Sequence, residues 1–114
     1  MIFNELPEFL GDVKKLSKKY QSLPEDLEII KKVLVVYPDE RPPFSYRINN
    51  LGLNSAVIKV KKMACKSIKG KGVNSGLRLI YAFIIESNEI TLIEIFHKNS
   101  KENEDRERIV GKFE

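Results

Sequence analysis

Residues 77–96, LRLIYAFIIESNEITLIEIF, predict two neighbouring strands of a β-sheet. Residues 77–85 form a run of strand length that is apolar enough to lie at the centre of a sheet. Ser87 and Asn88 form a tight turn, and residues 90–96 return as the second strand. We therefore expect an antiparallel pair at the middle of the fold, with the other elements packed around it.

Two further strands are expected before this pair. Residues 56–65 alternate between an aliphatic row and a second row that includes Lys59 and Lys61, which is the two-residue period of a strand. Residues 44–48 show a shorter alternation of the same kind. The glycine-containing stretch 66–75, KSIKGKGVNS, predicts a loop that leads into the central strand.

Two helices are expected ahead of the strands. Apolar residues at helical spacing run from Leu6 to Tyr20, with lysines on the other face. The stretch from Ser22 to Glu25 has the form of a capping box for a second helix, which Pro38 ends. Because the connection is short, we expect the two helices to form an antiparallel hairpin.

The order of these elements predicts the fold class. The charged segment 99–110 has helical character, so the chain is expected to end in a short helix. The predicted class is α+β: an N-terminal two-helix hairpin packed on one face of a small antiparallel sheet, with a short C-terminal helix. With 114 residues, the chain is expected to form a single domain over residues 1–114.

Composition excludes several classes of protein. Hydrophobic residues make up 42% and charged residues 32%, which is globular composition and not that of a disordered chain. No apolar run approaches the roughly 18 residues of a membrane helix, and the acidic N-terminus is unlike a signal peptide. With one cysteine, Cys65, and one histidine, we expect no disulfide, no metal site and no cofactor. The lone cysteine favours a reducing compartment and hence a cytoplasmic location.

The charge is distributed unevenly along the chain. The formal net charge is +4, but residues 41–85 carry nine basic and no acidic side chains, whereas the flanking segments are net acidic. A basic stretch of this length favours a phosphate-binding surface, and the alternative is a set of solvated lysines. The nine residues are Arg41, Arg47, Lys59, Lys61, Lys62, Lys66, Lys69, Lys71 and Arg78.

A cluster of candidate catalytic residues follows from the strand pattern. Lys59 and Lys61 are two residues apart and share a face, and Arg78 lies on the next strand. His97 and Lys98 end the following strand, where regular alternation would bring only one of them to the same face. Such a cluster can hold a phosphodiester and stabilise charge that develops at phosphorus.

Each of these candidates also has a structural interpretation. Arg78 would form an ion pair with Glu94 across the sheet, His97 would be a strand-end histidine, and the two strand lysines would be exposed to solvent. Cys65 is expected to be a small core residue. The GKG of residues 70–72 lacks the spacing of a Walker motif, although the lysines of the loop 66–75 suit a polyanion.

Four segments together resemble the RelE/ParE superfamily of bacterial toxins. They are residues 57–65 (VIKVKKMAC), 75–81 (SGLRLIY), 91–98 (TLIEIFHK) and 104–109 (EDRERI). The resemblance extends over residues 9–109 and rests on the order and spacing of these segments. It implies a small twisted antiparallel sheet packed by two N-terminal helices.

The resemblance also implies an activity and partners. The RelE branch cleaves mRNA in the ribosomal A site, where the 2′-OH attacks the adjacent phosphate with the help of basic residues. The ParE branch poisons DNA gyrase. Toxins of both branches are neutralised by a small antitoxin encoded beside them.

Particular residues of this chain match the nuclease branch. Lys59 and Lys61 resemble its basic pair, Arg78 its phosphate-contacting arginine, and Lys98 or His97 a basic residue of the last strand. The further residues expected to bind RNA are Lys62, Lys66, Lys69, Lys71 and Arg47.

One departure from the nuclease pattern affects the general base. Characterised nucleases of the family have a tyrosine shortly after the last strand, whereas residues 99–111 contain no aromatic residue and Phe113 has no hydroxyl. Lys59, Lys61, His97 or Glu94 would have to serve instead.

The leading hypothesis is a metal-independent, ribosome-dependent mRNA endoribonuclease that acts as a toxin and is neutralised by a cognate antitoxin. A surface with nine basic residues suits ribosomal RNA and mRNA, which favours this hypothesis. The alternatives are a gyrase inhibitor, and a toxin-fold module that binds nucleic acid or an antitoxin without catalysis.

Overall fold

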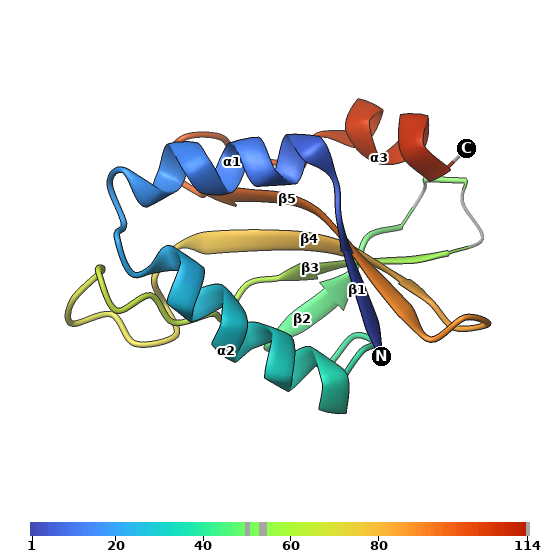
Figure 1. Cartoon of the computed structure of the whole chain (residues 1–114), viewed down its shortest axis with the longest axis horizontal. Helices are drawn as coiled ribbons and strands as arrows, with labels where there is room; N and C mark the ends of the chain where they lie inside the picture. The colour runs from blue at the N-terminus through green and yellow to red at the C-terminus, as the bar shows by residue number, and fades with distance from the viewer. Residues whose placement is uncertain (50, 53–54, 114) are drawn as a thin grey trace.

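The computed structural model describes residues 1–49, 51–52 and 55–113, and shows an α+β chain (Figure 1). Within these residues three helices and five strands follow one another along the chain. They are β1 (Ile2–Glu5), α1 (Pro7–Ser17), α2 (Leu23–Val36), β2 (Ser45–Arg47), β3 (Ala56–Val60), β4 (Leu77–Ile84), β5 (Glu89–His97) and α3 (Arg106–Phe113). No helix of the described residues is long and apolar enough to cross a membrane.

The five strands form one mixed sheet in the order β1-β5-β4-β3-β2. Strands β2 to β5 are antiparallel neighbours, and β4 lies in the middle, as its apolar sequence predicts. The expectation of a purely antiparallel sheet is wrong, because β1 pairs in parallel with β5 at one edge. This strand is held through its backbone, with the N–H of Ile2 donating to the carbonyl of Asn88 over 3.2 Å. Three of its four residues are exposed, so it has no apolar alternation that could predict it.

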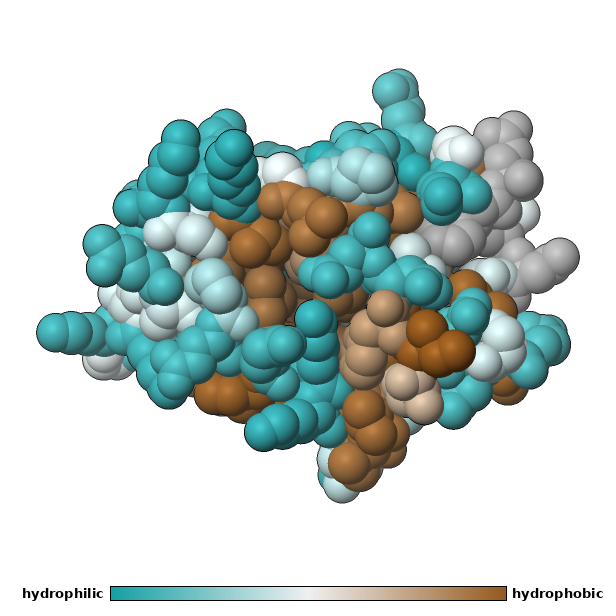
Figure 2. All heavy atoms as spheres, viewed as in Figure 1, coloured by the Kyte–Doolittle hydropathy of each residue, from teal (hydrophilic) through white to brown (hydrophobic). Residues whose placement is uncertain are grey.

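Helices α1 and α2 lie on the same side of the sheet and run in roughly opposite directions (Figure 1). Phe9 of α1 and Leu23 and Leu34 of α2 are fully buried in the core between the helices and the sheet. Tyr81 of β4 is also fully buried, and its hydroxyl donates to the carbonyl of Pro38, just beyond α2, over 2.7 Å. Burial raises the pKa of this hydroxyl. Figure 2 shows a hydrophobic band between the two helices, bordered by hydrophilic side chains.

Several local predictions need correction. Ser22 does not cap α2: its backbone is helical, and its hydroxyl donates to the carboxylate of Asp26 over 2.7 Å. Strand β3 ends at Val60 and not at residue 65, and beyond it Met63 is buried while Ala64 is exposed. The last helix begins at Arg106 because the preceding residues form turns and contacts with the sheet.

Candidate nucleic-acid interface

One face of the sheet, turned away from α1 and α2, carries the basic strand residues. Across β2, β3 and β4, Tyr46 pairs with Lys59, and Lys59 with Ile80, so these side chains share a face. The next residue, Tyr81, points to the helices, so Ile80 and its row point the other way. We call this side, defined by Tyr46, Lys59, Lys61 and Arg78, the lysine face.

The structure brings Lys61 and Arg78 together on the lysine face. A guanidinium nitrogen of Arg78 donates to the carbonyls of Lys61, over 3.2 Å, and of Leu77, over 3.3 Å. The ammonium of Lys61 lies 5.0 Å from the ring centroid of Tyr46. Within the described residues neither Lys61 nor Arg78 has a carboxylate partner, and the alternative ion pair between Arg78 and Glu94 is not formed. Two cations are therefore available beside each other.

Lys59 shares this face but is already engaged. Its ammonium lies 3.1 Å from the carboxylate of Glu104, and the two side chains are 13% and 7% exposed. Burial raises the pKa of Glu104, but hydrogen bonds from its own backbone N–H and from Lys59 outweigh this and hold the pKa below its ordinary value. Lys59 is therefore neutralised by a carboxylate in this structure, which the charge pattern along the chain did not predict.

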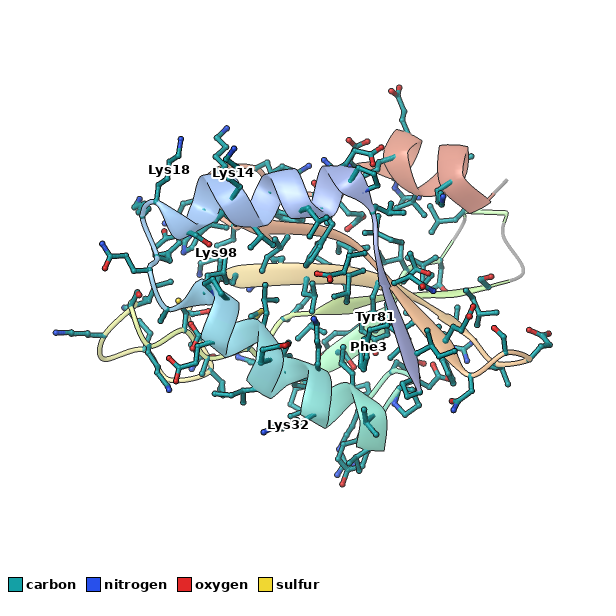
Figure 3. All side chains as sticks on the ribbon, viewed as in Figure 1. Phe3, Lys14, Lys18, Lys32, Tyr81 and Lys98 are labelled. Atoms are coloured by element: carbon teal, nitrogen blue, oxygen red, sulfur yellow. The ribbon has the colours of Figure 1, made fainter. Side chains whose placement is uncertain are left out.

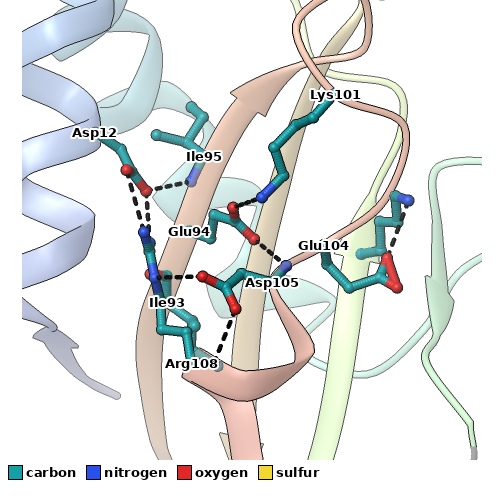
Figure 4. Close-up of polar contacts among 9 residues, drawn as sticks. Asp12, Ile93, Glu94, Ile95, Lys101, Glu104, Asp105 and Arg108 are labelled. Atoms are coloured by element: carbon teal, nitrogen blue, oxygen red, sulfur yellow. Dashed lines mark hydrogen bonds and ion pairs between the residues drawn. The ribbon is translucent and has the colours of Figure 1, made fainter.

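The segment before α3 is held against the same face by a polar network (Figure 4). The buried carboxylate of Glu94 accepts hydrogen bonds from the ammonium of Lys101 and, over 2.8 Å, from the backbone N–H of Asp105. Arg108 of α3 donates to Asp12 of α1 over 2.7 Å and to the carbonyl of Ile93 over 3.0 Å. Glu94 is thus a structural anchor with both oxygens occupied, which leaves it poorly placed to act as a general base.

His97 lies on the opposite side of the sheet from the lysine face. Its ring stacks on Tyr20 with centroids 6.0 Å apart. Nδ1 accepts from the backbone N–H of Asn99 over 3.1 Å, which leaves Nε2 to donate to the carbonyl of Ser75 over 3.0 Å. Both nitrogens have partners, so the structure supports the interpretation of His97 as a strand-end histidine.

Lys98 lies at the end of β5, on the side of the molecule where α1 connects to α2 (Figure 3). Its backbone N–H continues the sheet by donating to the carbonyl of Gly76 over 2.9 Å. The exposed side chain lines a cavity of about 400 Å³ together with Lys71, Asn74 and His97. The expected cluster of five catalytic residues is therefore divided among the lysine face, the Glu104 contact and this cavity.

The residues expected to bind RNA fall into two groups. Arg47 forms an ion pair with Asp39, and Lys66 forms one with Glu25 at 2.7 Å. Lys62 donates to the amide oxygen of Asn74 over 2.6 Å, while Lys69 and Lys71 are exposed on the loop 66–75. No carboxylate of the described residues pairs with this second group, which consists of Lys62, Lys69 and Lys71.

A buried polar cluster anchors the start of the basic loop. The carboxylate of Asp26, 4% exposed, accepts from the hydroxyl of Ser22 and from the backbone N–H of Lys66. The N–H of Ser67 donates to the same Ser22 hydroxyl over 2.8 Å. Cys65 is buried beside this hydroxyl, and burial raises the pKa of its thiol, so its prediction as a core residue is confirmed. Ser22 lies directly before α2 and four residues ahead of Asp26, and this spacing is the local feature of the sequence that could have indicated the cluster.

The two residues that sequence reasoning missed at the lysine face are Tyr46 and Glu104. Tyr46 was recognised only as part of a strand, and Glu104 only as part of a charged helix.

In the part of the chain that the structure describes, no group of three or more His, Cys, Asp or Glu side chains is placed to hold a metal ion.

Comparisons with known proteins give no match that bears on the function of this site. No family model matches the chain, and no curated protein matches its sequence. The resemblance to the RelE/ParE superfamily therefore stays a prediction that rests on the residues quoted above.

Proposed function

We propose that this protein is a toxin of the RelE type, a ribosome-dependent endoribonuclease that cleaves mRNA in the cytoplasm. The observation that supports this most is the pair of neighbouring cations, Lys61 and Arg78, on the face of the sheet away from α1 and α2. Because neither has a carboxylate partner within the described residues, both are free to meet phosphate oxygens.

The proposed chemistry is an attack by the 2′-oxygen of one nucleotide on the phosphorus that follows it. The new bond joins the 2′-oxygen to phosphorus, and the bond from phosphorus to the 5′-oxygen breaks. The 2′-hydroxyl gives up its proton, and the leaving 5′-oxygen takes one up. Negative charge increases on the non-bridging oxygens during this step, where Arg78 and Lys61 would stabilise it.

A second candidate is a module of the same fold that binds RNA and does not cut it. This is favoured by the contacts of the other candidate bases. Lys59 is paired with Glu104, Glu94 is bound by Lys101 and Asp105, and both nitrogens of His97 have partners. None of these three side chains is free to accept the 2′-proton without first losing a contact.

The proposal includes an antitoxin as partner. Such a partner would carry an acidic, amphipathic segment whose apolar residues lie along the helices while its acids meet the basic surface. The hydrophobic band between α1 and α2 in Figure 2 supports the apolar part of this arrangement. Because the lysine face lies on the opposite side of the sheet, the acidic part of the segment would have to pass around an edge of the sheet to reach it. Charge complementarity would make association fast and sensitive to salt.

The test is cell-free translation with the purified protein. We expect translation to stop and the mRNA to be cut within codons, and Arg78→Ala to lower the cleavage rate about 100- to 1000-fold. Lys32→Ala, which removes an exposed lysine of α2, is the matched control and should cleave normally. Intact mRNA with linearised, gyrase-trapped DNA would instead identify a gyrase inhibitor, and intact mRNA that is bound to the protein would identify the non-catalytic module.

A further inference from the structure

Tyr46 is the aromatic residue that β2 adds to the lysine face. It lies opposite Lys59 in the register of β2 and β3, and the residue is 36% exposed. The ammonium of Lys61 lies 5.0 Å from its ring centroid. Lys61 is connected in turn to Arg78 through the hydrogen bond from the guanidinium to its carbonyl. An exposed ring on β2, a lysine directly after β3 and an arginine on β4 thus follow one another across this face.

The other three tyrosines of the chain have different surroundings. Tyr81 is fully buried, and Tyr20 stacks on His97 on the helical side. Tyr37 is as exposed as Tyr46, at 39%, but it follows α2 and its ring is covered by the guanidinium of Arg41 at 3.7 Å. Tyr46 is therefore the one tyrosine on the lysine face, and Tyr37 offers a control with equal exposure.

We propose that Tyr46 is a stacking platform for a base of single-stranded RNA whose backbone phosphate is held by Lys61 and Arg78. The inference rests on the proposed function, and assigns the ligand class at the same site. An aromatic ring stacks on any base, because every base has a π-face, and nearby cations hold the backbone. The bases of a duplex are stacked on one another and cannot reach the ring, so the site selects an unpaired strand.

The spacing of the strands suits this arrangement. Strands β2 and β4 are separated by β3, which places their backbones about 10 Å apart. The long side chains of Lys61 and Arg78 project from the same face as the ring, so a base and its neighbouring phosphate can be held at once. Lys61 lies against the ring and next to Arg78, and would contact the phosphate from the side of the base.

The experiment is fluorescence anisotropy of a 5′-labelled, ten-nucleotide single-stranded RNA titrated with the full chain. We expect Tyr46→Ala and Tyr46→Leu to weaken binding about 10-fold, and Tyr46→Phe to bind like the wild type because its π-face remains. Tyr37→Ala is the matched control and should leave the affinity unchanged. Tyr46→Leu keeps an apolar side chain but removes the aromatic ring, so it tests stacking without emptying the position. Thermal melts of each variant would show any loss of folding.

Salt dependence separates stacking from phosphate contact. The slope of log K against log salt should be the same for the wild type and Tyr46→Ala, whereas Arg78→Ala should reduce it by about one phosphate contact. An abasic strand of equal length should bind the wild type and Tyr46→Ala equally well. If both Tyr46→Ala and Tyr46→Leu bind the RNA like the wild type, or if the wild type prefers duplex RNA or a protein ligand, the stacking proposal is wrong.

The two proposals fail separately. RNA binding that depends on Tyr46, in a protein that does not cut mRNA during translation, would remove the nuclease proposal and keep the stacking site. If Tyr46→Ala changes neither mRNA cleavage nor RNA affinity, the stacking site is removed and the nuclease proposal is kept.

Discussion

The ammonium of Lys59 lies 3.1 Å from the carboxylate of Glu104, which follows it 45 residues later in the chain. Both side chains are largely buried, and the Lys59 ammonium also lies 5.7 Å from the ring centroid of Phe96. The pair therefore joins β3 to the segment before α3. Two charges taken out of water stabilise a fold only together, because removal of one leaves the other without compensation.

Loss of Glu104 should destabilise the protein. We expect Glu104→Ala to lower the free energy of unfolding by about 3 kcal/mol, the lower end of the range for breaking a buried ion pair. Glu102→Ala, which removes an exposed acid two residues earlier, should change it by less than about 0.5 kcal/mol. Urea denaturation measures both variants, and equal losses would contradict a specific role for the buried pair.

The same pair should make stability depend on pH. The hydrogen bonds of Glu104 outweigh its burial and hold its pKa below the ordinary value of 4.5, so the unfolded carboxyl takes up a proton at higher pH than the folded one. Its contribution is then complete above the unfolded value and is lost as the pH falls through the lower folded value. We expect the stability difference between the wild type and Glu104→Gln to shrink as the pH falls below about 4.5. A difference that stays constant with pH would contradict this.

Much of the fold could be predicted because it depends on local periodicity. The apolar run that became β4 and the helical spacing in α1 and α2 are signals within one element. Strand β1 has no such signal, because it is an edge strand held through backbone hydrogen bonds and exposes most of its side chains. The early end of β3 at Val60 also escaped prediction, since Ala64 continues the aliphatic row in the sequence, although it is exposed in the structure while Met63 of the other row is buried.

In the candidate site, only the placement of residues on neighbouring strands could be predicted from the sequence. Alternation and strand order together predicted that Lys61 and Arg78 would lie near each other. They could not predict that Lys59 would be neutralised, because its partner Glu104 comes from a segment that packs on the sheet only in the folded state. Regular alternation would send His97 and Lys98 to opposite faces, but the structure places both beside one cavity at the end of β5, where His97 stacks on Tyr20.

Arg78 and Glu94 should behave independently of each other in stability measurements. Arg78 makes its hydrogen bonds to two backbone carbonyls, so Arg78→Ala should cost only about 1 kcal/mol of unfolding free energy. Glu94→Ala should cost about 3 kcal/mol, because it leaves Lys101 and the N–H of Asp105 without their acceptor. A double-mutant cycle should give a coupling energy within about 0.5 kcal/mol of zero. A large coupling energy would indicate that the two residues form an ion pair after all.

Gly76 should not tolerate a side chain. Its φ is +92°, and a Cβ atom would lie 2.6 Å from Nε2 of His97. Gly76→Ala should therefore cost about 3 kcal/mol through overlap and the left-handed backbone. Gly72→Ala, where φ is +55° and the space is open, should cost only about 1 kcal/mol. In a double variant with His97→Ala, the part of the Gly76→Ala destabilisation that comes from overlap with the His97 ring should disappear. If thermal unfolding instead shows that the destabilisations of the two single variants simply add, the His97 ring does not exclude the new side chain.

The basic loop should depend on Asp26 and not on the neighbouring Glu25. Asp26 is buried and accepts the backbone N–H of Lys66, whereas the ion pair of Glu25 with the Lys66 ammonium is exposed. We expect Asp26→Ala to speed hydrogen exchange of the Lys66 amide about tenfold, because a buried donor loses its acceptor. Glu25→Ala should change the rate by less than about twofold, since exposed pairs contribute little. Hydrogen exchange followed by NMR separates the two, and similar acceleration in both variants would show that the surface ion pair, and not the buried carboxylate, holds the loop.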